Sequence, residues 1–221
     1  MAVPARRREA GSNGLPALRG RQRGFSLVEM IVVVAIIMLL AAILLPVLEA
    51  AVGKAESTSC LSNLQHLGMA ARLYCDDYDE RIVPARLPAG GPTTICWDVT
   101  IQPYLHNRLI LVCPSDEAPR RLAGAQCELH SYGINLELAE VGGYLGCALR
   151  LLDLDDPAGC VLFCELNGQR FATHGVSYDV DGLQRVAVRR HGNGANYAFA
   201  DGHTKWLLPE RTEQPDNFWH P

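Results

Sequence analysis

The sequence lacks the short motifs that mark common catalytic and cofactor sites. It contains no GxSxG, HExxH, GxGxxG or Walker A pattern. None of its eight cysteines falls in a CxxC pair, so zinc ribbons and thioredoxin-type redox sites are unsupported. A cysteine nucleophile paired with a histidine stays open, but no pattern indicates an enzyme, and we expect the protein not to be one.

Basic residues are scarce beyond residue 24. Residues 1–24 carry six arginines and one glutamate, whereas the remaining 197 residues carry a net charge of −9. An acidic surface repels the phosphate backbone of nucleic acids. The sequence therefore predicts no nucleic-acid partner for the main body of the chain.

Charged residues are absent from residues 30–47, the longest apolar run of the chain. With residues 25–29 the run reaches about 23 residues, which at about 1.5 Å per residue spans the roughly 30 Å hydrocarbon core of a bilayer. The preceding arginines predict a cytoplasmic N-terminus and an exported, periplasmic or extracellular remainder, in a single-pass inner-membrane protein.

Glu29 lies inside this run and decides between three interpretations. A secretory signal would have a shorter apolar core before a small-residue cleavage site, for which residues 51–53 could serve. A plain membrane anchor explains the length and the arginines, but it leaves the cost of a charge in the membrane unexplained. The third interpretation rests on the residues around the glutamate.

The stretch GFSLVE, residues 24–29, resembles the class III signal of type IV pilins and type II secretion pseudopilins. The resemblance implies that a prepilin peptidase cuts after Gly24 and methylates the new N-terminus at Phe25. The apolar helix would then assemble with other pilin-like subunits. Glu29 of one subunit can pair with the ammonium group at Phe25 of another, which lowers the cost of burying either charge. Pro46 is expected to kink or loosen the helix, at a depth where pilins commonly carry a proline.

An amphipathic helix is expected to follow the membrane segment. Apolar residues recur there at three- and four-residue spacings, which predicts one face buried against a globular head; they are Cys60, Leu64, Leu67, Ala71 and Cys75. The later chain is rich in Gly and Pro, with short apolar runs typical of strands. We therefore expect an α+β fold, with a long N-terminal helix packed on an antiparallel β-sheet head. Its expected parts are a cleaved leader (1–24), a transmembrane and assembly helix (25–48), an amphipathic helix (49–76) and an exported head (77–221).

An acidic cluster follows the predicted helix at Asp76, Asp77 and Asp79. Carboxylates are the oxygen ligands that calcium prefers, so this cluster is a candidate calcium site. The spacing lacks the glycine and the terminal glutamate of an EF-hand loop. A solvated turn is the favoured interpretation, and no cofactor is expected.

The C-terminal part contains His191, nine residues, and then Asp201-Gly202. This pattern resembles the C-terminal signature of one pilin-like group. Two other stretches, LVCPSDE (111–117) and SYGIN (131–135), also resemble parts of that group's sequences. Asp-Gly is also a strong signal for a type I′ hairpin turn, which would place Tyr197 opposite Trp206 and leave the histidines near the sheet edges. His191, Asp201 and His203 are the best candidates for a metal or acid–base cluster, but the structural hairpin is the favoured interpretation.

An even number of cysteines suits disulfides in an oxidising compartment, with buried free thiols as the alternative. Cys113 and Cys127 are the disulfide candidates, because the loop between them contains Pro114, Pro119 and Gly124 and closes with little strain.

The function that these patterns favour is that of a prepilin-like subunit. A prepilin peptidase would process it, and it would assemble through its N-terminal helix into a type IV pilus or a type II secretion pseudopilus. The alternative is a monomeric membrane-anchored periplasmic binding protein or hydrolase that uses a prepilin-type signal.

Overall fold

The computed structural model describes eight parts of the chain: residues 24–90, 93–117, 119, 126–140, 146–166, 175–176, 190–212 and 218–219. The chain forms two compact units, residues 1–46 and 47–221. The expected leader lies outside the described residues except for Gly24.

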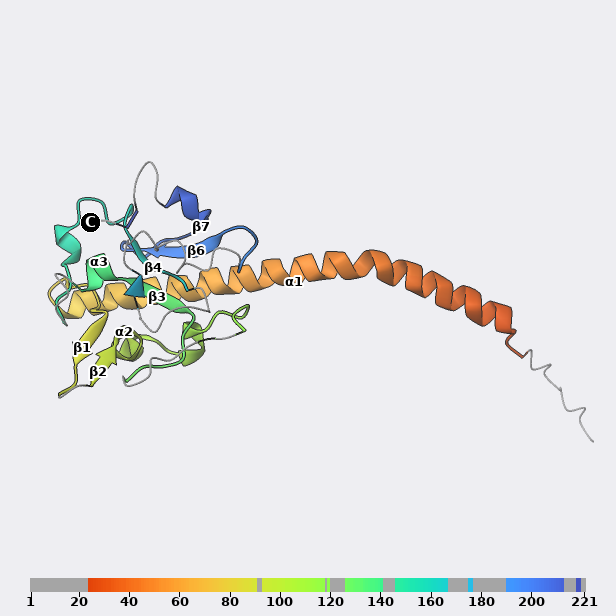
Figure 1. Ribbon diagram of the computed structural model, residues 1–221, viewed down its shortest axis with the longest axis horizontal. Coiled ribbons are helices and arrows are strands. Elements are labelled where there is room, and N and C mark those ends of the chain that lie inside the picture. The colour runs from red at the N-terminus through yellow and green to blue at the C-terminus, as the bar shows by residue number, and fades with distance from the viewer. Residues whose placement is uncertain are drawn as a thin grey trace, which may run out of the picture. The chain divides into compact units, whose positions relative to one another are not determined.

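Helix α1, Leu27–Asp77, runs through both units and contains Pro46 without a break in its helical assignment (Figure 1). Its large apolar side chains up to Leu48 are exposed in the isolated chain. It is the one helix in the described part of the chain that is long and apolar enough to cross a membrane.

The second half of α1 presents the predicted apolar face to the head. Cys60, Leu64, Leu67, Ala71 and Cys75 are all buried, which confirms the expected amphipathic pattern. They share a core with side chains of the sheet, so α1 packs on one face of it.

The main sheet has the order β5-β3-β4-β6-β7, and it confirms the predicted α+β class (Figure 1). Its strands are β3 (Tyr132–Asn135), β4 (Val161–Glu165), β5 (Gly175–Val176), β6 (Ala195–Phe199) and β7 (Thr204–Leu207). Strands β3, β4, β6 and β7 are antiparallel, while β5 pairs with β3 in parallel.

A β-bulge shifts the register between β4 and β6. Val161 and Cys164 pack on the face away from α1, whereas Leu162 and Phe163 belong to the core on the α1 face. The extra residue therefore separates side chains that strict alternation would place together. Glu165 at the end of β4 reaches Cys60 on the α1 side.

Short elements complete the head. A two-stranded sheet pairs β1 with β2. The elements are β1 (Arg86–Pro88), β2 (Thr94–Cys96), α2 (Trp97–Thr100), η1 (Gln102–Tyr104), η2 (Arg108–Leu111), α3 (Leu136–Ala139), η4 (Leu151–Asp153) and η5 (Pro209–Arg211).

The predicted type I′ turn is wrong by one residue. Asn196, not Tyr197, lies opposite Trp206, so the two strands are offset by one residue from the predicted register. Gly202 has a positive φ of 95°, but Asp201 does not. The Ala200 backbone N–H donates to the carbonyl oxygen of Cys160 at 2.9 Å, and this bond to the neighbouring segment draws Ala200 out of the ladder.

The predicted Cys113–Cys127 disulfide is also wrong, because Cys127 is bonded to Cys96. The backbone around Gln126 runs beside β2, with the Cys96 N–H donating to the Gln126 carbonyl oxygen at 3.0 Å. Cys113 is instead a buried free cysteine.

Candidate functional site

The N-terminus of α1 is closed by a reciprocal pair of hydrogen bonds between Ser26 and Glu29. The Ser26 backbone N–H donates to Glu29 Oε2 at 2.8 Å, and the Glu29 backbone N–H donates to Ser26 Oγ at 3.2 Å. This is a capping box, which satisfies two helix N–H groups that would otherwise lack partners. The signal for it was present in the sequence as Ser-x-x-Glu before an apolar run, but the sequence analysis did not use it.

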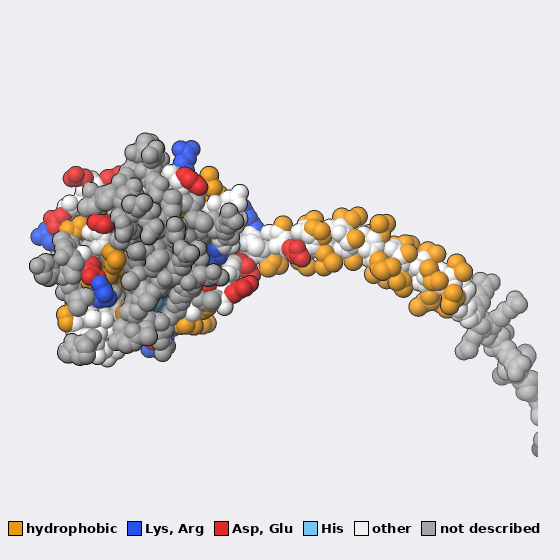
Figure 2. Space-filling model, viewed as in Figure 1, with side chains coloured by type: hydrophobic (Ala, Val, Ile, Leu, Met, Phe, Trp, Pro, Cys, Tyr) orange, Lys and Arg blue, Asp and Glu red, His pale blue; other side chains and the backbone are white. Residues whose placement is uncertain are grey.

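The residues at the predicted cleavage site are accessible. Phe25 is 73% exposed, and Gly24 precedes the helix in non-helical backbone. Figure 2 shows hydrophobic side chains along the N-terminal part of α1. A continuous apolar surface of this size requires lipid or protein around it.

Comparison with known families gives one match. The model for the prokaryotic N-terminal methylation motif matches residues 19–45. No curated protein and no solved structure matches the chain. The chain thus carries a prepilin-type N-terminal motif, and with the apolar helix this indicates membrane anchoring and processing of the general prepilin kind, consistent with a pilin-like subunit.

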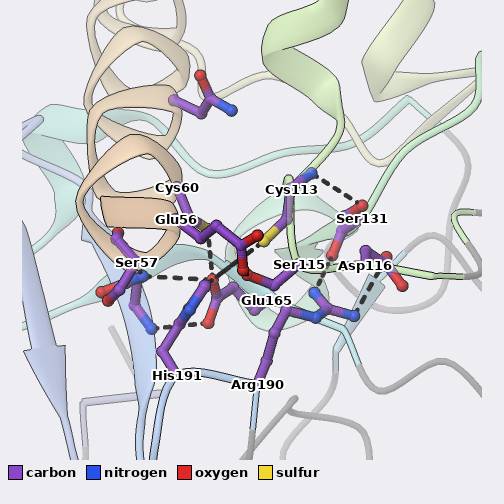
Figure 3. Close-up of polar contacts among 12 residues, drawn as sticks. Glu56, Ser57, Cys60, Cys113, Ser115, Asp116, Ser131, Glu165, Arg190 and His191 are labelled. Carbon is purple, nitrogen blue, oxygen red and sulfur yellow. Dashed lines mark hydrogen bonds and ion pairs between the residues drawn. The ribbon is translucent and has the colours of Figure 1, made fainter. Parts of the chain in front are cut away.

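The head contains a second site that the sequence analysis missed, which we call the buried cluster (Figure 3). It consists of Cys60, Cys113, Glu165 and His191, all buried. Cys60 lies on α1, Cys113 follows η2, Glu165 ends β4 and His191 precedes β6.

The four side chains of the buried cluster point at one another. His191 Nε2 lies 2.8 Å from Glu165 Oε1 and 3.4 Å from Cys113 Sγ. The Cys60 thiol donates to the same Glu165 oxygen, and Cys113 Sγ lies 4.0 Å from it. One ligand atom from each residue lies within 4.8 Å of all the others.

The contacts within the cluster change the acidity of its members. The pKa of Cys113 is lowered to about 6, because its contacts with Cys60 and His191 outweigh burial. Burial by itself lowers the pKa of His191, but hydrogen bonds with Cys113 and Glu165 reverse this and raise it to about 9. Burial, followed by the contact with Cys113, raises the pKa of the Cys60 thiol. The site therefore favours a thiolate at Cys113 beside a thiol at Cys60.

Neighbouring groups hold the cluster from outside. The Asn196 backbone N–H donates to Glu165 Oε2 at 3.0 Å, which leaves Oε1 facing the cluster. Tyr132 Oη lies 3.2 Å from Cys60 Sγ. Ser131 Oγ accepts from the Cys113 backbone N–H at 3.0 Å.

The structure separates the residues that were predicted as a C-terminal metal or acid–base group. His191 is buried in the cluster rather than near a sheet edge. Asp201 and His203 form an exposed pair of their own, with Asp201 Oδ1 2.6 Å from His203 Nδ1. Sequence spacing could not reveal the true partners of His191, because they lie 26 or more residues away.

The acidic residues at the C-terminal end of α1 contact other side chains of the protein. Asp77 Oδ2 accepts from the Tyr104 hydroxyl at 2.7 Å, and Asp76 Oδ1 lies 4.0 Å from Arg72 Nη2. Asp79 has a positive φ of 52° in the turn that leaves the helix. A calcium role for these three residues stays a prediction.

Proposed function

We propose that the chain is a prepilin-like subunit, cut after Gly24, methylated at Phe25 and built through α1 into a type IV pilus or a type II secretion pseudopilus. The observation that carries the proposal is an exposed apolar helix that begins inside the matched methylation motif. The leader lies in the cytoplasm and the head is exported.

Assembly would cover the apolar surface that the N-terminal part of α1 exposes in the isolated chain. The apolar side chains of residues 27–48 avoid water in the bilayer and would avoid it equally against the same segments of other subunits. The helix therefore moves from lipid to a filament core without exposing this surface.

Glu29 has a role at both stages. In the single chain it caps its own helix through Ser26. In a filament it exchanges this neutral donor for the ammonium at Phe25 of a neighbouring subunit, and the charged hydrogen bond is the stronger of the two.

The test is the mass and location of the chain in cells that have a prepilin peptidase. We expect a mature chain that begins at N-methylated Phe25 and is recovered from sheared filaments or from a cross-linked pseudopilus. A full-length chain with its leader intact would overturn the processing step. A cut chain that stays monomeric in the membrane would overturn assembly and favour an anchored binding protein or hydrolase.

A further inference from the structure

The buried cluster brings together four side chains of the kinds that zinc proteins use as ligands. Four ionisable side chains from four separate segments converge in the core of the head. Burying so many ionisable groups is costly unless they are paired or coordinate a metal. The proposed assembly through α1 makes no use of them.

We propose that the buried cluster is a structural zinc site, with Cys60 Sγ, Cys113 Sγ, Glu165 Oε1 and His191 Nε2 as its four ligands. Zinc takes four such ligands in a tetrahedron. Bond lengths of about 2.0–2.3 Å place the ligand atoms roughly 3.4–3.8 Å apart. The Cys113–His191 separation of 3.4 Å matches, and the His191–Glu165 and Cys113–Glu165 separations of 2.8 and 4.0 Å lie on either side of this range. Cys60 Sγ is in hydrogen-bond contact with Glu165 Oε1, so these two atoms must move apart when zinc binds.

The alternative of a catalytic triad conflicts with the geometry. In a Cys-His-Glu triad the imidazole contacts the nucleophile through one ring nitrogen and the carboxylate through the other. Here Cys113 and Glu165 both approach Nε2 of His191. Convergence on one nitrogen is what a shared central ion produces, and all four side chains are buried.

The ligand types select the metal. Calcium and magnesium take oxygen ligands, whereas two sulfurs exclude them. Thiolate together with imidazole and carboxylate suits zinc. Two thiolates and one carboxylate bring three negative charges, of which a divalent ion neutralises two. One negative charge remains. The Asn196 backbone N–H, which donates to Glu165 Oε2, and the Tyr132 hydroxyl, which lies beside Cys60 Sγ, are the polar groups next to it.

Contacts of its backbone hold His191 in position. Trp206 Nε1 donates to the carbonyl oxygen of His191 at 3.1 Å, and a β-bridge joins His191 to Gly194. His191 Nδ1 is buried without a hydrogen-bond partner among the described residues. The orientation of the His191 ring therefore depends on the position of its backbone and on the group that binds Nε2. Nε2 is the nitrogen that would bind zinc.

The experiment measures bound metal in the full chain, purified in detergent after expression with zinc in the medium. We expect about one zinc ion per chain that survives gel filtration. Cys60→Ala and His191→Ala should each lower the zinc content at least tenfold. The matched controls are Cys75→Ala, another buried cysteine of α1, and His203→Ala, an exposed histidine; both should keep the wild-type content.

Cobalt substitution and thiol mapping keep the test decisive if the variants fold poorly. Wild-type chain loaded with Co²⁺ should show tetrahedral visible bands and a thiolate-to-cobalt absorption of two-sulfur intensity. Wild type with less than about a tenth of a zinc ion per chain and no such spectrum would overturn the proposal. So would equal zinc loss in the controls, or a Cys60–Cys113 disulfide in a non-reducing peptide map.

None of these outcomes bears on whether α1 assembles, so failure here leaves the proposed function standing.

Discussion

Gly68 on α1 and Gly202 in the β6–β7 loop meet through their backbones. A Cβ atom added at Gly68 would lie 3.1 Å from the Gly202 carbonyl oxygen and 3.2 Å from its Cα. Helix and loop can approach this closely because Gly68 has no side chain on the face that meets the loop. The contact is one of the points at which α1 and the sheet are held together.

Gly68→Ala should destabilise the head, although alanine is the better helix former. The added methyl group meets backbone that cannot rotate away, and overpacking of this kind costs about 1–3 kcal/mol. The matched control is Gly53→Ala on the same helix, where nothing lies within 4 Å of the added atom. That substitution should stabilise by roughly 0.5–1 kcal/mol. Denaturant unfolding of the full chain in detergent measures both changes in the free energy of unfolding. Equal changes at the two positions would contradict the close contact.

Gly202→Val should destabilise the head by roughly 1–3 kcal/mol through the backbone alone. The φ of 95° at Gly202 is one that a β-branched residue rarely adopts. The nearest atom to an added Cβ is Arg72 Cγ at 3.6 Å, so crowding contributes little. A melting temperature equal to that of wild type would show that the loop does not hold this conformation.

Gly24→Val should leave the precursor uncut, because under the proposed function the peptidase cuts after this glycine. Nothing in the described structure packs against Gly24, so the substitution should not affect the fold. Intact-mass measurement of membranes from a peptidase-positive host is the check. Normal cleavage of this variant would place the processing site elsewhere.

Three variants at the start of α1 separate capping from charge pairing. Glu29→Gln keeps an acceptor for the Ser26 N–H but has no charge, so it should keep the cap and fail to enter filaments. Ser26→Ala loses one half of the capping box, at a typical cost of about 1 kcal/mol, and keeps the carboxylate. It should still assemble. Glu29→Ala should be cut normally and fail to assemble. Recovery of Glu29→Gln in filaments at the wild-type level would reject the charge pair.

Non-reducing peptide mapping should recover Cys96 linked to Cys127 and should leave Cys113 unlinked. The bond joins residues 31 apart, for which the chain-entropy model gives roughly 3–4 kcal/mol of stabilisation. Cys96→Ala with Cys127→Ala should therefore lower stability by a few kcal/mol and should leave any bound zinc in place. A Cys113–Cys127 peptide would reject the observed pairing.

The sequence was most informative where the determining interactions are local. The apolar run is recognised by its length and the stripe from Cys60 to Cys75 by its helical periodicity, and the structure confirms that the stripe is buried. The hairpin was predicted at the right place with the wrong register. Its register depends on the bond from Ala200 to Cys160, which joins segments 40 residues apart.

Long-range pairings were out of reach for the same reason. His191 meets Glu165, Cys113 and Cys60 only because the bulged β4, the loop after η2 and α1 are brought together by the fold. Cys127 likewise finds Cys96 because the backbone at Gln126 lies against β2. None of these pairings leaves a periodic or spacing signal in a single sequence.

Under the proposed function, the capping box also affects which subunits a growing filament accepts. An uncut precursor has an amide rather than an ammonium at Phe25, so it offers Glu29 of a neighbouring subunit no charge. That Glu29 then keeps its own Ser26 N–H, a partner that is always within reach. The preference for a cut neighbour over an uncut one equals the difference between a charged and a neutral hydrogen bond, about 1 kcal/mol or more. Repeated at every addition, this difference would enrich the filament in mature chains without a separate inspection step.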